Sequence, residues 1–376
     1  MSFSMDRTGA IPALTGVRFF AALMVFSSHY AIPGSTGAFL TFQQSGYAGV
    51  TLFFILSGFI IAYNYLNEFE KSPASSILPF YFARFSRIYP LYAFCLIYAW
   101  MSAPSDLPIL PHFLVAQAWY SDVLYAMGFN ATGWSVSVEA FLYLAFPFII
   151  PAMTYLGITT SRKKLFIAIA TITASIFFSA IYFWLSGKGA LPLKDPNSAH
   201  RWLYRMPATR LMDFSLGICA AIYYMRFWKE TERSSMNWSI IIYASIAASV
   251  ILMGYSKNLI SSFSWDAAYA IPFTLIIFGL ATSKKSKIAE FLSKPSVVLL
   301  GEASFAMYLV HLLVKKLYPI SQDSITNPMA IHITFLVIVI SLSVGLHIVI
   351  EKPAQKFLRT AFKSKTKINI VEHPSK

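Results

Sequence analysis

The sequence predicts an all-α integral membrane protein with about ten transmembrane helices and with both termini in the cytoplasm. Three observations support this fold class. Hydrophobic residues make up 57% of the 376 residues and charged residues only 12%, whereas a soluble domain averages about 25% charged residues. Mean hydropathy is +0.59. Ten apolar runs approach the ~20 residues that a helix needs to cross the hydrocarbon core.

The order of the apolar runs gives the expected spans. The run 107–127 is interrupted by Pro108 and Pro111, so we interpret it as an outer-surface or re-entrant segment and not as a span. Residues 1–351 are then a transmembrane domain, and 352–376 are a short basic cytoplasmic tail. The ten expected spans are 12–32, 46–66, 84–103, 134–154, 165–185, 208–226, 238–255, 266–282, 296–318 and 330–350.

The basic residues explain the orientation and the net charge of +14. With the N-terminus inside, 22 of the 30 Lys and Arg residues fall on the inner side and 8 on the outer side, which is the bias of cytoplasmic loops. Counting 107–127 as a span spoils this sorting. No nucleic-acid partner is therefore expected. The two cysteines, Cys95 and Cys219, lie in apolar runs, and neither a disulfide framework nor a metal site is expected from them.

Arg18 and His29 share the first expected span, and ionisable residues inside a membrane are functional candidates by default. This run lacks a small-residue cleavage site, so we interpret it as a retained helix. Arg18 and His29 are 11 residues apart, which places both on one face of the helix, about 16 Å apart along its axis. Alone, Arg18 also suits a snorkelling anchor, and His29 a hydrogen-bonded core histidine.

Arg84 and Arg87 open the third expected span. Their i, i+3 spacing puts both guanidinium groups on one side of the helix, and a helix N-terminus adds partial positive charge. Such forks match phosphate oxygens. The alternative is ordinary interfacial charge. With Arg18, they would form a cytoplasmic mouth for a long anionic donor such as acyl-coenzyme A, whose reactive end reaches the depth of His29.

Glu139 lies at the outer end of the fourth expected span, in the run from Gly133 to Tyr143. A carboxylate there could orient a histidine or bind a sugar hydroxyl, and Trp134 could stack on a sugar ring; the alternative is a cap or a structural ion pair. His311 is expected at the depth of His29 and could also orient it.

His347 and Glu351 form an i, i+4 pair that closes the last expected span, and we interpret this pair as structural.

Six motifs in order resemble acyltransferase family 3, a family of integral-membrane O-acyltransferases that modify surface polysaccharides. The resemblance covers essentially the whole chain. The motifs are Leu14-Thr-Gly-Val-Arg18 with His29, Gly46 to Phe59, Arg84-x-x-Arg87 before Ile88-Tyr-Pro90, Gly133 to Glu139 with Tyr143, Leu300 to His311, and Glu351-Lys-Pro353.

The resemblance implies an enzyme of the bacterial cytoplasmic (inner) membrane. It would pass an acyl group, usually acetyl, from cytoplasmic acyl-coenzyme A to a hydroxyl of a cell-surface or lipid-linked carbohydrate. Acyl-coenzyme A would be a co-substrate, with no cofactor bound permanently. Membrane lipid, an exopolysaccharide, O-antigen or lipid-linked acceptor, and polysaccharide-assembly proteins would be its partners. Arg18, Arg84 and Arg87 would bind the donor and His29 and Glu139 would be catalytic, with Trp134, Tyr143 and His311 in support.

The chain departs from the family pattern at three positions. Many members carry acidic residues where this chain has Thr15, Thr51 and Ala140, so these cannot supply a general base and Glu139 gains weight. Many relatives also carry a C-terminal esterase-like domain, and without one we expect this chain to act alone or with a separate partner.

Two mechanisms and two other functions stay open. His29 would act as a general base or as a nucleophile that forms an acyl-imidazole. The alternative functions are a transporter or flippase of a lipid-linked sugar or anion, and a non-catalytic partner of polysaccharide export.

Overall fold

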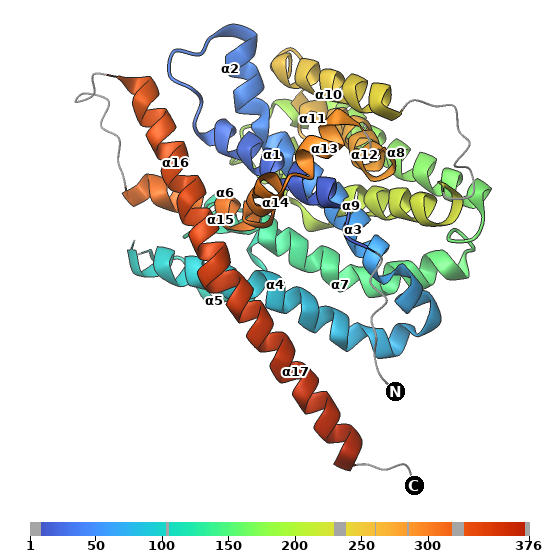
Figure 1. Ribbon diagram of the computed structural model, residues 1–376. Coiled ribbons are helices and arrows are strands. Elements are labelled where there is room, and N and C mark those ends of the chain that lie inside the picture. Colours follow the sequence, from blue (N-terminus) through green and yellow to red (C-terminus); the bar gives the residue numbers. More distant parts are fainter. Residues whose placement is uncertain are drawn as a thin grey trace.

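The computed structural model describes residues 9–102, 105–228, 238–259, 261–283, 286–317 and 327–372, and these residues form a bundle of helices (Figure 1). Each expected span contains a helix. The longer helices are α1 (Pro12–His29), α3 (Gly49–Lys71), α4 (Pro73–Ser102), α7 (Gly133–Tyr155), α8 (Arg162–Leu185), α9 (Pro207–Ile222), α10 (Trp238–Gly254), α12 (Ala267–Thr282), α15 (Ser304–Leu317), α16 (Pro328–Leu346) and α17 (Lys352–Glu372).

Shorter helices fill the connections. The run 107–127 holds three of them in place of a span, as expected from its prolines. These short elements are α2 (Gly37–Gln44), η1 (Ser45–Ala48), α5 (Leu110–Phe113), η2 (Gln117–Trp119), α6 (Val123–Ala126), η3 (Lys188–Ala190), η4 (His200–Arg205), η5 (Tyr223–Trp228), α11 (Ser261–Ser264), α13 (Lys287–Leu292), α14 (Pro295–Glu302) and η8 (His347–Glu351).

The helices have the length and composition of a multi-pass membrane protein. Within the described ranges, five are long and apolar enough to cross a bilayer, or six when α14 and α15 count as one broken span. The number of ten spans and the orientation of the termini stay predictions. The expected sorting of charge also rests on Arg7, Lys229, Arg233, Lys284 and Lys285, which lie outside the described residues.

Helix α4 begins earlier than expected. The third span was expected to start at residue 84. The helix starts at Pro73 and continues through Pro79 and Pro90. Proline suits the first helical position, because its missing N–H needs no partner there. Arg84 and Arg87 therefore lie about three turns inside the helix. The partial charge of a helix N-terminus does not reach them, and that part of the prediction was wrong.

The expected span 296–318 is not one straight helix. It is broken at Ala303 into α14 and α15, whose axes meet at 58°. Next to the break, Gly301 lies against α1, and a Cβ atom added there would collide with the Thr15 carbonyl. Small residues allow this close approach of helix backbones. The contact fixes the helix that carries Arg18 and His29 against the helix that leads to His311.

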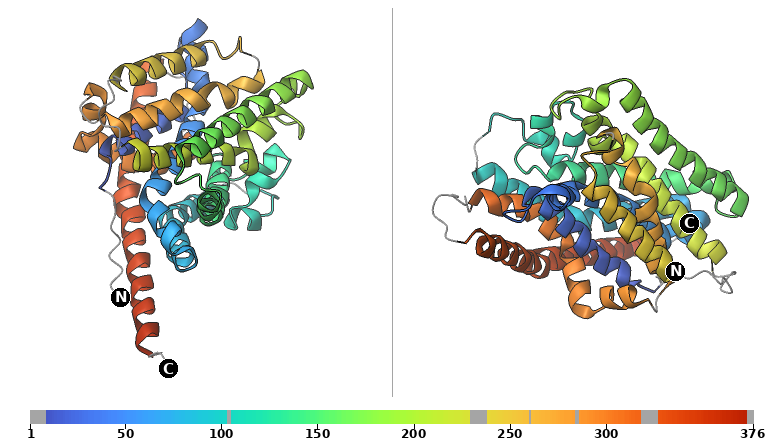
Figure 2. Two further views of the ribbon diagram at one scale, coloured as in Figure 1. Left: turned by 90° about the vertical axis from the view of Figure 1, so that its right-hand side faces the viewer. Right: turned by 90° about the horizontal axis from the view of Figure 1, so that it is seen from above.

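Helices α16 and α17 run as one long helix along the bundle, and α17 extends beyond it in two views (Figures 1 and 2). The segment expected as a tail is thus helical from Lys352 to Glu372. At the junction, His347 Nδ1 lies 2.9 Å from Glu351 Oε2, which confirms the expected i, i+4 pair. Glu302 adds its carboxylate, 2.8 Å from Lys352 Nζ and 3.4 Å from His347 Nε2. This cluster ties α14 to the last two helices.

Candidate active site

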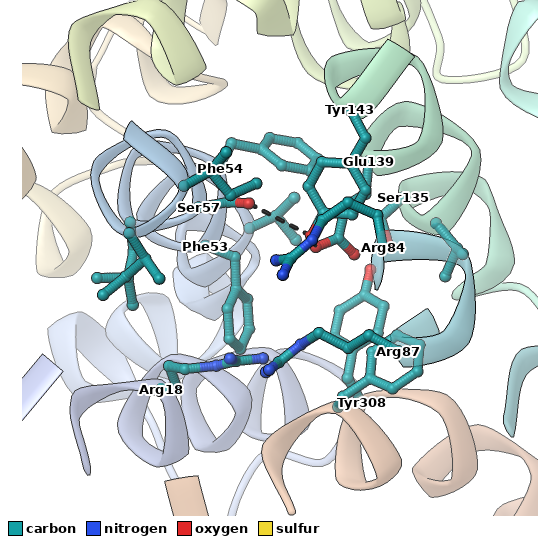
Figure 3. A pocket seen from close by; sticks show the side chains of 16 residues that line it. Arg18, Phe53, Phe54, Ser57, Arg84, Arg87, Ser135, Glu139, Tyr143 and Tyr308 are labelled. Atoms are coloured by element: carbon teal, nitrogen blue, oxygen red, sulfur yellow. Dashed lines mark hydrogen bonds between the residues drawn. The ribbon is translucent and has the colours of Figure 1, made fainter. Parts of the chain in front are cut away.

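A pocket lies where α1, α3, α4, α7 and α15 meet, and five of the predicted site residues line it (Figure 3). It encloses about 790 Å³, including the part that is open to solvent. Its polar lining consists of Arg18, Ser57, Arg84, Arg87, Ser135, Glu139, Tyr143 and Tyr308. Three arginines against one glutamate give this pocket an excess of positive charge.

Arg18 and Arg87 reach toward one another across the floor of the pocket from α1 and α4 (Figure 3). Both side chains are half-buried. Neither guanidinium makes a hydrogen bond or ion pair with any residue of the described ranges, although the charges of Arg87, Glu139 and Glu351 all act on Arg18. Two half-buried cations that face each other without a bonded carboxylate repel each other, and a bound anion would relieve this repulsion. This arrangement is suited to a ligand with several negative oxygens.

Arg84 is held more firmly than the other two arginines. Its Nη2 donates to the Tyr65 hydroxyl at 3.2 Å, and the guanidinium lies 5.3 to 5.9 Å from the ring centroids of Tyr65, Phe80 and Tyr143. Aromatic faces stabilise a cation and leave its N–H groups available. Sequence reasoning missed Tyr65, because nothing in its spacing from Arg84 indicates a contact between α3 and α4.

Glu139 lies in the same pocket as the arginines. The Tyr143 hydroxyl, one helical turn further along α7, donates to its carboxylate, and Ser57 of α3 donates to the Tyr143 oxygen at 3.4 Å. Orientation of His29 was one of the roles expected for Glu139. In this structure the hydrogen-bond partner of Glu139 is Tyr143 and that of His29 is His311. The charge of Glu139 compensates part of the positive charge of the three arginines.

His29 and His311 form a second polar group, at the end of α1. The two rings are joined by a hydrogen bond of 3.0 Å between His29 Nδ1 and His311 Nε2. His311 is buried, with 1% of its surface exposed, whereas His29 is exposed. His29 does not line the arginine pocket. The prediction that His311 lies at the depth of His29 is confirmed.

Tyr308 connects the two groups. Its ring lines the arginine pocket and also contacts the His311 ring edge-on, with centroids 6.2 Å apart. Phe53, which also lines the pocket, packs edge-on against Tyr308, with a centroid distance of 6.1 Å. The Tyr308 ring therefore contacts both the pocket and the histidine pair. Sequence reasoning missed Tyr308, although its i, i+3 spacing from His311 placed it on the same helix face.

Trp134 and Thr51 lie outside the pocket lining. Trp134 is buried and packs on Tyr204, with a centroid distance of 4.9 Å, so its ring is not open to a sugar. Thr51 is fully buried and donates to Asp266 at 3.2 Å. That carboxylate also pairs with Arg210 at 2.7 Å. Thr51 therefore belongs to a buried ion-pair cluster, which sequence reasoning missed because its members lie on helices far apart in the sequence.

The chain matches a family model, that of an acyltransferase domain, over residues 11–350. It belongs to this family, acyltransferase family 3. It is 28% identical to acyltransferase MdmB of Streptomyces mycarofaciens, over 94% of this chain and 93% of that protein. It is 24% identical to O-acetyltransferase OatA of Staphylococcus aureus, over 80% of this chain but only half of that protein. No solved structure matches it.

Family membership defines the class of chemistry. The protein is an O-acyltransferase, an enzyme that transfers an acyl group to a hydroxyl, and its helices are those of a multi-pass membrane protein. Such a reaction needs a place for an activated acyl donor and a group that removes the proton of the hydroxyl. The arginine pocket and the histidine pair are the candidates for these two tasks.

Proposed function

We propose that the protein transfers an acyl group, in the first instance acetyl, from acyl-coenzyme A on the cytoplasmic side to a carbohydrate hydroxyl on the other side of the bacterial inner membrane. One observation carries the proposal. Arg18 and Arg87 face each other in a pocket without a bonded acid, and His29 lies on the same helix as Arg18, about 16 Å further along its axis.

The donor would bind by its phosphates. Coenzyme A combines a diphosphate and a further phosphate with a long, thin pantetheine arm that ends in the thioester. Guanidinium groups bind phosphate oxygens with paired, charge-assisted hydrogen bonds. Arg18 and Arg87 are free for such bonds, and Arg84 is held in place beside them by Tyr65. The arm would then extend past Phe53 and Tyr308 toward His29.

The chemistry would take place at His29. As a general base, its Nε2 takes the proton of the sugar hydroxyl while the oxygen attacks the thioester carbonyl. The C–S bond breaks, and the coenzyme A thiolate leaves and takes up the proton. As a nucleophile, the same nitrogen would first carry the acyl group as an acyl-imidazole. A labelled acyl group trapped on the protein before acceptor is added would identify the second route.

The test uses purified protein in sealed vesicles, with acetyl-coenzyme A supplied on one side and a mixture of cell-surface glycans on the other. We expect thiol release on the donor side and acetyl ester on the glycan. Donor supplied only on the His29 side should give neither. Movement of a lipid-linked sugar without thiol release would instead establish the transporter alternative.

Donor binding gives a second readout that does not need the right acceptor. Acetyl-coenzyme A should bind the wild-type protein and bind poorly to the double variant Arg84→Ala/Arg87→Ala. The matched control is Arg162→Ala, because Arg162 is an arginine on α8 that packs on Phe166 and Tyr223, away from the pocket. A folded wild-type protein that binds no acyl-coenzyme A would overturn the proposed donor.

A further inference from the structure

We propose that His311 fixes the tautomer of His29, so that His29 presents the unprotonated Nε2 to the acceptor hydroxyl. This role deepens the proposed function and rests on it. It makes His311 a positioning residue, since His311 acts through His29 and is itself buried.

The first hydrogen bond joins the His311 ring to the backbone of α15. His311 Nδ1 lies 3.1 Å from the carbonyl oxygen of Met307, one turn earlier in the helix. A carbonyl oxygen only accepts hydrogen bonds, so His311 Nδ1 must carry the hydrogen. In the neutral ring the other nitrogen, Nε2, is then an acceptor.

The next bond transmits this choice to His29. His311 Nε2 lies 3.0 Å from His29 Nδ1, and because Nε2 accepts, His29 Nδ1 must donate. The hydrogen of a neutral His29 is therefore on Nδ1, and the lone pair is on Nε2. That nitrogen has no bonded partner among the described residues. Two hydrogen bonds thus link the Met307 carbonyl to His311 and His311 to His29. They orient the base as in a hydrolase, with a backbone carbonyl in the place of the acid.

The surroundings disfavour a positive charge on His311. His311 is almost fully buried, and a buried charge without a partner is costly. No carboxylate of the described ranges bonds to either ring. A cation acts on both rings: Lys315 lies one turn after His311, and its Nζ is 4.5 Å from the centroid of the Tyr30 ring. It disfavours a second positive charge on the histidines.

Two substitutions separate the proposed role from simple packing. In His311→Gln the amide oxygen stands near the position of the ring Nε2 and can still accept from His29 Nδ1. In His311→Asn the amide ends near the position of Nδ1 and cannot reach His29. We expect kcat to fall about 10- to 100-fold in His311→Asn and to stay within about fivefold of wild type in His311→Gln. The KM for acetyl-coenzyme A should change little in either variant.

The kinetic outcome and the proposed function can fail separately. Equal kcat values in the two variants would overturn the role of His311 while wild-type turnover still stood. If wild-type protein turned over no acetyl-coenzyme A, the proposed function would fail, and the tautomer would still be measurable. Nitrogen-15 NMR of histidine-labelled wild-type protein gives that measurement. We expect His29 to be protonated at Nδ1 and not at Nε2 in the neutral ring, and the reverse pattern would overturn the inference.

Discussion

The two ends of α1 differ in every property that matters for catalysis. At the Arg18 end, five helices surround a pocket in which three arginines outnumber one carboxylate. At the His29 end, two histidine rings are joined by a hydrogen bond, and the His29 side chain is exposed. The Arg18 end has the arginines that can hold an anion but no obvious base, whereas the His29 end has a base but no arginine cluster. A single helix thus separates binding from chemistry along its length.

The sharpest way to break this division is His29→Ala. Removing the base should lower kcat by about 10²- to 10⁴-fold, the range for a positioned acid or base. The affinity for acetyl-coenzyme A should stay within about threefold of wild type, because the arginines are unchanged. Thiol release and equilibrium donor binding measure the two quantities. A folded His29→Ala protein with a normal rate would remove His29 from the mechanism.

The converse change is the double variant Arg18→Gln/Arg87→Gln. Each lost charge-assisted hydrogen bond is worth about 1.5 to 3 kcal/mol, so donor binding should weaken by about 10²-fold or more. At saturating donor, kcat should be less affected than in His29→Ala. Arg162→Gln, in which an exposed arginine of α8 is changed, is the control. Unchanged donor binding in the double variant would show that the pocket serves another ligand.

Glu139→Gln tests whether the pocket takes part in the chemistry. The amide can still accept from Tyr143, but the negative charge near Arg18 is gone. We expect donor binding to strengthen by about two- to tenfold, with kcat within about fivefold of wild type, by the Coulomb term alone. Loss of kcat by more than about 100-fold, with donor binding retained, would make Glu139 a catalytic carboxylate and end the division.

Tyr308→Phe should have the smallest effect. The ring that lies between the pocket and His311 stays, and only the hydroxyl that bonds to Ser135 is lost. We expect kcat and donor affinity to stay within about threefold of wild type, in the same assays. A large loss of kcat would mean that this hydroxyl contacts the reacting groups and that the two regions meet at Tyr308.

The sequence was sufficient for properties that depend on position along a helix. A rise of 1.5 Å per residue set the depth of His29 relative to Arg18, and the same reasoning placed His311 at the depth of His29. Periodicity also paired His347 with Glu351, which the structure confirms. These inferences need no knowledge of which helices are neighbours.

Properties that depend on packing between helices were not predictable. Glu139 was expected to orient a histidine or to bind a sugar hydroxyl, and it lies with the arginines, because α7 packs beside α3 and α4. The start of α4 was expected at residue 84, yet the helix begins at Pro73 and continues through Pro79 and Pro90. The break at Ala303 lies beside the close contact of Gly301 with α1, which a single sequence does not reveal.

The break between α14 and α15 also bears on how the protein is made. At 1.5 Å per residue, an α14 of 8 residues and an α15 of 14 residues are about 12 and 21 Å long, and neither alone crosses a hydrocarbon core of about 30 Å. Polar groups exposed to lipid at such a break would be costly, and both Ala303 and Ser304 are buried by protein here. This segment therefore needs α1 in place before it is stable in the bilayer. The site is therefore complete only after the last third of the chain has been made, although His29 on α1 enters the membrane first.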